Sequence, residues 1–226
     1  LLDKSGTERL SPEDLQKEWY KLGTSFGMGA GDNETSITIS GLDENFEPSV
    51  KLLMELLKTP AADPGVLEEL KKIILISRAD AKKQAPSIHR ALYQFNRYGA
   101  ESSYLRMLPE AALRAMTMDE LHGIVTGLLD YKHTVSYTGT LSPRKVKRVL
   151  SKYHRIEGPL DDPPPYRFLK ARAPESTEIY FVPKETAQAN VRLESGSVDY
   201  DESIHAGVEL YNEYFAGGMG GIVFQE

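Results

Sequence analysis

The sequence predicts an α+β fold built from two units, each an antiparallel sheet covered on one face by helices. Three observations lead to this prediction. Short segments that alternate β-branched and polar residues lie between longer segments with helical apolar spacing. An acidic, proline-rich stretch without periodicity, residues 158–165, separates two parts of the chain. A new run of strand, strand and helix follows that stretch.

Composition bounds the function. The chain has 226 residues, of which 40% are hydrophobic, so it is long enough to bury a core. Its net charge of −6 argues against nucleic-acid binding as the main function. The basic runs at 82–83 and 144–148 are interpreted as solvated helix faces. No cysteine is present, which excludes thiolate catalysis, Cys-ligated zinc and disulfides.

The first elements follow from capping and periodicity. Residues 1–7 are expected to be the tail of a helix, and Ser11 with Pro12 starts another that runs to about residue 23. Residues 24–31 are rich in glycine but follow a helix and precede a strand, the reverse of a dinucleotide fingerprint. Residues 34–42 alternate isoleucine with Thr and Ser, which predicts a half-buried strand.

Helices are predicted over much of the middle of the chain. Residues 45–58 and 63–84 have helical apolar spacing. The second of these helices is expected to turn six apolar residues inward: Val66, Leu67, Leu70, Ile73, Ile74 and Ile76. Further helices are expected between residues 87 and 130, where Thr117 and Glu120 have the spacing of a capping box.

The remaining elements alternate again. Residues 132–139 are predicted to form a strand, and Ser142 starts a helix that ends near residue 153. After the proline-rich stretch, strands are expected at 178–182 and 188–194, and a helix from Asp201 onward. No apolar run approaches the roughly 20 residues of a membrane span.

A structural glycine loop follows that last helix. It contains Gly217, Gly218, Gly220 and Gly221. Glycine lets the backbone adopt positive φ, so the loop is interpreted as a helix C-cap. A phosphate cradle would need a preceding strand and a different glycine spacing, and neither is present.

This loop and its surroundings resemble a known family. The sequence YFAGGM at 214–219 followed by VFQE at 223–226 is similar to a segment of the insulinase, pitrilysin and mitochondrial processing peptidase family of zinc peptidases (inverzincins). GLDENF at 41–46 and SRADAKK at 77–83 resemble the second, non-catalytic half of bacterial members that carry two halves on one polypeptide. The chain begins with Leu1 and is expected to be a piece of such a protein.

The resemblance implies domain boundaries. Residues 1–157 would be most of an odd-numbered, third domain, which lacks its start. Residues 158–176 would be the linker, and residues 177–226 the start of the following, fourth domain, which lacks its end. Asp161 and Asp162 lie in that linker, where solvation is a better explanation for them than acid–base catalysis.

The resemblance also implies where catalysis does not occur. Active halves carry H-x-x-E-H on a helix and a later glutamate. That motif is absent, and the corresponding positions fall near Leu1 and near Ile76 or Ser77. No catalytic, cofactor-binding or metal residue is therefore assigned to this chain. The histidines show no local metal-binding spacing; they are His89, His122, His133, His154 and His205.

The function that the resemblance implies is that of a non-catalytic half, which closes the peptide-binding chamber of a zinc metalloendopeptidase. The expected partners are peptide substrates and the N-terminal catalytic half of the same polypeptide, which would hold the zinc. Neither a nucleic-acid partner nor a membrane span is expected. A periplasmic or extracellular location is favoured by the resemblance. The alternative is a non-enzymatic binding or assembly module of the same architecture.

Overall fold

The computed structural model describes residues 2–155, 158–185, 187–194 and 201–225. It divides into two compact units, Leu1–Ala171 and Arg172–Glu226, so the division falls within the segment expected to be a linker. Helices predominate, and the first unit contains two small antiparallel sheets. The predicted α+β class is confirmed, whereas the assignment of the two units to particular domains of a larger protein stays a prediction.

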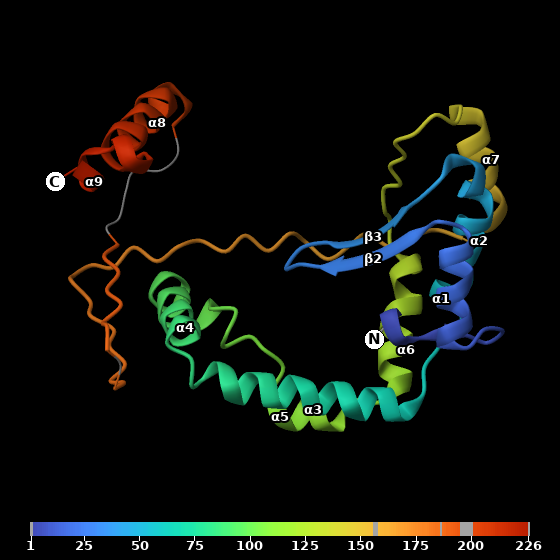
Figure 1. Cartoon of the computed structure of the whole chain (residues 1–226), viewed down its shortest axis with the longest axis horizontal. Helices are drawn as coiled ribbons and strands as arrows, with labels where there is room; N and C mark the ends of the chain where they lie inside the picture. Colours follow the sequence, from blue (N-terminus) through green and yellow to red (C-terminus); the bar gives the residue numbers. More distant parts are fainter. Residues whose placement is uncertain (1, 156–157, 186, 195–200, 226) are drawn as a thin grey trace. The chain divides into compact units, whose positions relative to one another are not determined.

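The core of the first unit lies among four helices (Figure 1). They are α1 (Pro12–Lys21), α2 (Phe46–Lys58), α6 (Met118–Gly127) and α7 (Pro143–Tyr153). α2 is central because it buries apolar residues on several sides and packs against both α6 and α7. The buried cluster consists of Leu2, Leu15, Trp19, Val50, Leu52, Met54, Leu56, Leu57, Val125 and Val149.

The helix starts agree with the capping signals of the sequence. Ser11 and Ser142 cap α1 and α7, each by accepting a hydrogen bond from a backbone N–H three residues later. Thr117 and Glu120 form the predicted capping box of α6. These local signals place the first turns of three of the four core helices.

A β-hairpin packs beside the core. Strand β2 (Ser25–Ala30) pairs antiparallel with β3 (Thr35–Ser40), so that Phe26 lies opposite Ile39. Phe26 also stacks on Trp19 of α1 with ring centroids 6.2 Å apart. Residues 24–31 received no strand prediction from the sequence, yet most of them form β2. Gly27 and Gly29 lie within β2, which is held in place by backbone hydrogen bonds to β3. Because glycine has no side chain, the sequence of this segment lacks the alternating pattern that indicates a strand.

Short elements complete this end of the unit. A 3₁₀ turn, η1 (Leu2–Lys4), stands where a helix tail was expected, and β1 (Gly6–Thr7) pairs antiparallel with β4 (Pro60–Ala61). A Cβ at Gly6 would lie 2.2 Å from the Leu10 carbonyl oxygen, so glycine is required for this close approach. A second 3₁₀ turn, η2 (Asp43–Asn45), leads from the hairpin into α2.

The middle of the chain forms α3 (Pro64–Ala81), α4 (Ala85–Tyr98), η3 (Gly99–Glu101) and α5 (Glu110–Ala115). α3 buries Leu67 and Lys71. The prediction that Ile73, Ile74 and Ile76 face inward is wrong, because they are 49%, 38% and 52% exposed. α5 packs against α3, but these three side chains remain exposed. A periodic apolar pattern is buried only where another element covers it.

Residues 132–139 are extended but do not form the predicted strand. A single bridge between Tyr131 and Asp161 follows η4 (Leu128–Asp130), and Lys132 donates its backbone N–H to the Asp161 carbonyl oxygen at 2.8 Å. Val135, expected to face inward, is 52% exposed. A strand requires a hydrogen-bonded neighbour, and no described strand pairs with this segment.

The second unit contains an extended segment followed by α8 (Glu202–Ala216), η5 (Gly218–Gly220) and α9 (Ile222–Gln225). Asp201 caps α8 as its spacing predicts. The strands predicted at 178–182 and 188–194 are wrong, because the described residues there pair with no other segment. Phe181 and Leu193 are accordingly 78% and 92% exposed.

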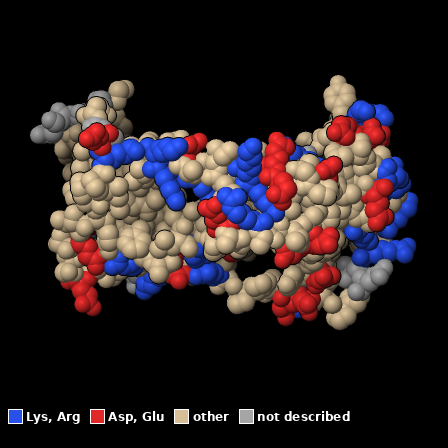
Figure 2. Space-filling view, turned by 90° about the horizontal axis from the view of Figure 1, so that it is seen from below, with Lys and Arg blue, Asp and Glu red and all other residues tan. Residues whose placement is uncertain are grey.

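Surface charge is mixed on the face drawn in Figure 2, where Lys and Arg side chains are interspersed with Asp and Glu. The ion pairs agree with this distribution, since several join residues three or four apart on one helix. Exposed pairs of this kind contribute little to stability. Within the described residues, no helix combines the length and apolarity that a membrane crossing requires.

Candidate functional site

The glycine loop ends α8. The backbone N–H of Gly217 donates to the Glu213 carbonyl oxygen, and Gly218 has a φ of 62°. A Cβ at Gly217 would lie 2.2 Å from the same carbonyl oxygen, and one at Gly221 would lie 2.9 Å from the Gly217 nitrogen. Gly220 lies in η5, between these close approaches. Gly217, Gly218 and Gly221 therefore allow the chain to turn tightly between α8 and α9, whereas a Cβ at Gly220 would meet nothing within 4 Å.

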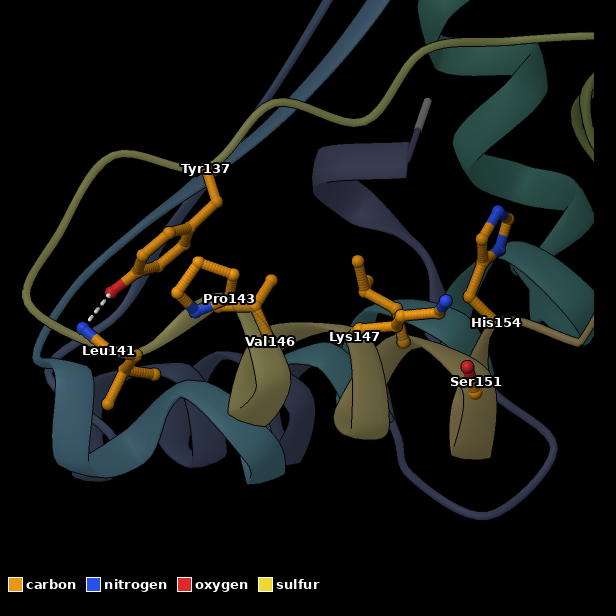
Figure 3. Close-up of a pocket in the computed structure, with 8 residues that line it drawn as sticks. Tyr137, Leu141, Pro143, Val146, Lys147, Ser151 and His154 are labelled. Atoms are coloured by element: carbon orange, nitrogen blue, oxygen red, sulfur yellow. Dashed lines mark hydrogen bonds between the residues drawn. The ribbon is translucent and has the colours of Figure 1, made fainter.

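A shallow hollow of about 450 Å³ lies in the first unit, between α7 and the segment that precedes it (Figure 3). Tyr137 and Leu141 form one side. On the other side, residues from successive turns of α7 face the same space, including Val146, Lys147 and His154. The lining is mainly apolar, with a few polar groups at its rim, which is the composition of sites that hold an apolar side chain.

A hydrogen-bonded cluster around Asp43 fixes one wall of the hollow. The Tyr137 hydroxyl donates to Asp43 Oδ1 at 2.5 Å, and the backbone N–H of Thr140 donates to Oδ2 at 2.7 Å. The Thr140 hydroxyl also donates to Oδ2. These bonds, led by the Thr140 hydroxyl, lower the pKa of Asp43. A Cβ at Gly139 would lie 2.1 Å from the Tyr137 oxygen, so only glycine fits beside the cluster.

Two histidines meet at the other end of the hollow. Nε2 of His133 and Nε2 of His154 are 2.6 Å apart, and the ring centroids are 4.8 Å apart. Nδ1 of His133 lies 2.6 Å from the Tyr131 carbonyl oxygen. A carbonyl oxygen only accepts, so His133 must carry its proton on Nδ1. The short contact between the two Nε2 atoms then requires one of them to carry a proton and the other to accept it.

Burial disfavours the charged form of His154. The pKa of His154 is lowered, chiefly because the ring is partly buried, with further contributions from the charges of His133 and Lys58. Nδ1 of His154 is buried and has no hydrogen-bond partner among the described residues. The expectation that these histidines are far apart holds along the sequence but not in space. Local spacing alone could not reveal a contact across 21 residues.

The positions that correspond to the metal ligands of active halves have no cluster of metal-binding side chains around them. Ile76 and Ser77 are exposed on α3, and Leu1 lies outside the described residues. Glu68 pairs with Lys71 at 2.7 Å, and Glu69 lies 3.9 Å from Lys4. In the described part of the chain, no three His, Asp or Glu side chains are grouped so that they could hold a metal ion. The described residues therefore do not fit a zinc site of the kind that the resemblance implies for active halves.

The sequence matches no protein-family model. It also matches no curated protein. Solved structures do match the fold. The ferredoxin protease FusC, solved in complex with Arabidopsis ferredoxin, aligns with a TM-score of 0.65 and 16% identity over 76% of this chain. A peptidase M16 inactive domain from Pseudomonas fluorescens aligns with a TM-score of 0.62 and 16% identity over the whole of this chain.

The periplasmic protease PqqL from Escherichia coli also aligns, with a TM-score of 0.56 and 14% identity over 76% of this chain. The chain spans 19% of the FusC and PqqL chains and 55% of the Pseudomonas fluorescens chain. At these identities the similarity establishes the fold. The chain therefore has a fold found in M16 peptidase structures, including an inactive domain of that kind.

Proposed function

We propose that this chain is part of the non-catalytic half of an insulinase-like zinc metallopeptidase, where it forms part of the wall of a peptide-binding chamber. The observation that carries the proposal is the alignment of the M16 inactive domain with the whole of this chain. Two further observations support it. The chain lacks H-x-x-E-H, and the described residues group no set of metal donors.

The proposal divides the work between two parts of one polypeptide. The N-terminal half would hold the zinc, which in such enzymes activates the water that attacks the peptide bond. This chain would contribute shape and contacts. Its described residues offer a rigid core around α2 and a hollow along α7, features that suit a scaffold and binding surface. Peptides are the expected substrates.

We also propose a periplasmic or extracellular location. The support is that one structural neighbour, PqqL, is a periplasmic protease of Escherichia coli. Fractionation of cells that express the natural gene, followed by detection with an antibody to this chain, would test the location. Signal in the cytoplasmic fraction alone would contradict it.

Reconstitution tests the enzymatic proposal. The segment encoded upstream is expressed alone and together with this chain, and cleavage of quenched fluorescent peptides is measured. We expect cleavage only when both parts are present, loss of cleavage with a chelator, and recovery when zinc is restored. An upstream segment with its metal-binding histidines replaced by alanine serves as the control. Peptide binding without zinc-dependent cleavage would favour a non-enzymatic binding module.

The metal content of this chain alone is a separate test. The purified chain is dialysed against a trace of zinc and its metal is measured by mass spectrometry. We expect no stoichiometric zinc. One tightly bound zinc per chain would contradict the proposal, because this chain's own histidines and carboxylates would then have to bind the metal.

A further inference from the structure

The helix α7 carries a charge opposite to that of the protein. Residues 142–155 contain no Asp or Glu, although the whole chain has a net charge of −6. The six basic residues of this stretch are Arg144, Lys145, Lys147, Arg148, Lys152 and Arg155. A single-sign segment of this density attracts groups of the opposite charge.

These cations are available to a ligand. All six are exposed. Lys152 is engaged, since its Nζ lies 2.8 Å from Glu47. The other five have no ion-pair partner among the described residues. Lys145 and Arg148 interact electrostatically with Asp43 and Glu47 without forming ion pairs, so two carboxylates stand against six cations. The exposed face of α7 therefore keeps an excess positive charge.

The apolar side of α7 is not available to a membrane. Val146 and Val149 are 9% and 1% exposed, and the helix packs against α2. An interfacial helix must place such residues among lipid chains. In this protein the buried side belongs to the core, and only the basic side faces outward. Membrane insertion of α7 would require the core to open.

The hollow adds a second requirement for the ligand. It borders the basic face, because Lys147 and Ser151 of α7 line it together with Tyr137, Leu141 and Leu150. Its lining is mainly apolar and it opens to solvent, so it suits one large apolar side chain rather than a phosphate (Figure 3). A nucleic acid would satisfy the cations but would leave this apolar surface unused.

We infer that the hollow and the exposed face of α7 bind an acidic segment of another protein. The segment would place a large apolar side chain, such as leucine or phenylalanine, in the hollow, and its flanking carboxylates would contact Arg144, Lys147 and Arg148. Charge supplies attraction and orientation, and the apolar side chain supplies selectivity. The inference is independent of the proposed function, because it uses only the charge and shape of this surface.

Binding is measured by fluorescence anisotropy with the purified 226-residue chain. The probe is a short labelled peptide rich in Asp and Glu with one central leucine. The same peptide with alanine at that position tests the hollow. We expect the leucine peptide to bind about tenfold more tightly, and both to weaken when ionic strength rises from about 0.05 M to about 0.5 M. Labelled single-stranded DNA and phosphatidylserine vesicles are measured in parallel.

Three variants locate the site on the protein. Lys147→Glu combined with Arg148→Glu reverses two cations of α7, and we expect at least about tenfold weaker binding of both peptides. Lys72→Glu combined with Lys82→Glu makes the same change in net charge on α3 and its C-cap, and is expected to change binding less than about twofold. Ser151→Trp fills the hollow and should remove the preference for leucine over alanine. Circular dichroism checks that each variant is folded.

Several outcomes would overturn the inference. Equal weakening by the α7 and α3 pairs would show that only net charge matters. Equal affinity for the leucine and alanine peptides would remove the role of the hollow. Tighter binding of the DNA or the vesicles than of the leucine peptide would assign the basic face to a different class of ligand. Absence of peptide binding at low ionic strength would refute it outright.

Discussion

Replacement of Glu55 should separate the contributions of a buried hydroxyl and an exposed ion pair. Glu55 lies on α2, where its side chain is 20% exposed. Its Oε1 accepts a hydrogen bond from the Thr7 hydroxyl at 2.8 Å and from Arg9 Nε at 3.0 Å. Its Oε2 accepts from Arg9 Nη2 at 2.9 Å. The carboxylate thus joins α2 to the chain around β1.

The two partners are expected to contribute differently. The Arg9 side chain is 61% exposed, so screening limits its ion pair with Glu55 to about 0.5–1 kcal/mol. Thr7 is 4% exposed, and without Glu55 its hydroxyl loses its acceptor, which costs about 1–3 kcal/mol. Glu55→Ala should therefore lower the free energy of unfolding by about 1.5–4 kcal/mol, and Arg9→Ala by no more than about 1 kcal/mol.

Urea unfolding followed by circular dichroism measures both values. Glu55→Gln is the discriminating variant, because the amide oxygen still accepts from Thr7 while the charge is lost. It should cost about as much as Arg9→Ala. The reasoning would be refuted if Glu55→Gln and Glu55→Ala were equally destabilising, or if Arg9→Ala cost as much as Glu55→Ala.

The same site has a defined dependence on pH. The pKa of Glu55 is lowered from 4.5, mainly because Arg9 donates hydrogen bonds to the carboxylate, although burial acts in the opposite direction. A lowered pKa in the folded state contributes stability above the unfolded value and loses it as pH falls through the folded value. The loss should therefore begin near pH 4.5 and continue below it, and Glu55→Gln should remove this part of the acid sensitivity.

Three further variants test other parts of the structure by the same unfolding assay. Leu56→Ala, at a side chain 1% exposed in the core, should cost about 2–5 kcal/mol, and a cost typical of a surface site would contradict the described packing. Gly218→Ala should lower the free energy of unfolding of the second unit, followed by its helical signal, by about 1 kcal/mol, because the φ of Gly218 is 62°. Unchanged stability would show that this conformation is not required. The lowered pKa of His154 predicts full stability above about pH 6.5 and a decline in stability as the pH falls below that value. His154→Phe should reduce this decline. An unaltered pH profile in the variant would exclude the histidine pair as the cause.

Local features were the predictable part of the fold. The capping residues Ser11, Thr117, Ser142 and Asp201 mark helix starts because each satisfies backbone N–H groups within its own first turn. The α+β class follows from such starts together with the alternating strand that became β3. These signals are complete within a few residues, so sequence alone suffices to find them.

Features that depend on distant partners were not predictable. β2 is a strand because β3 lies beside it, whereas residues 132–139 have a strand pattern and no partner among the described strands. The exposed Ile73 and Ile76 lie on a periodic helix face that the described residues leave uncovered. His133 and His154 come together only because the chain returns along α7. The hollow beside them is formed by segments that are far apart in the sequence, so local spacing could not predict that they lie together.

The reactivity of Lys71 reports on the packing of α3 against α5. Its Nζ donates to Glu68 at 2.7 Å and to the Arg114 carbonyl oxygen at 3.0 Å, and its side chain is 9% exposed. Every other lysine in the described part of the chain is exposed. An acylating reagent must reach the amine and displace these bonds, so Lys71 is the lysine that covalent labelling modifies last. The rate at which Lys71 is modified, measured by mass spectrometry, would therefore report how often the two helices separate.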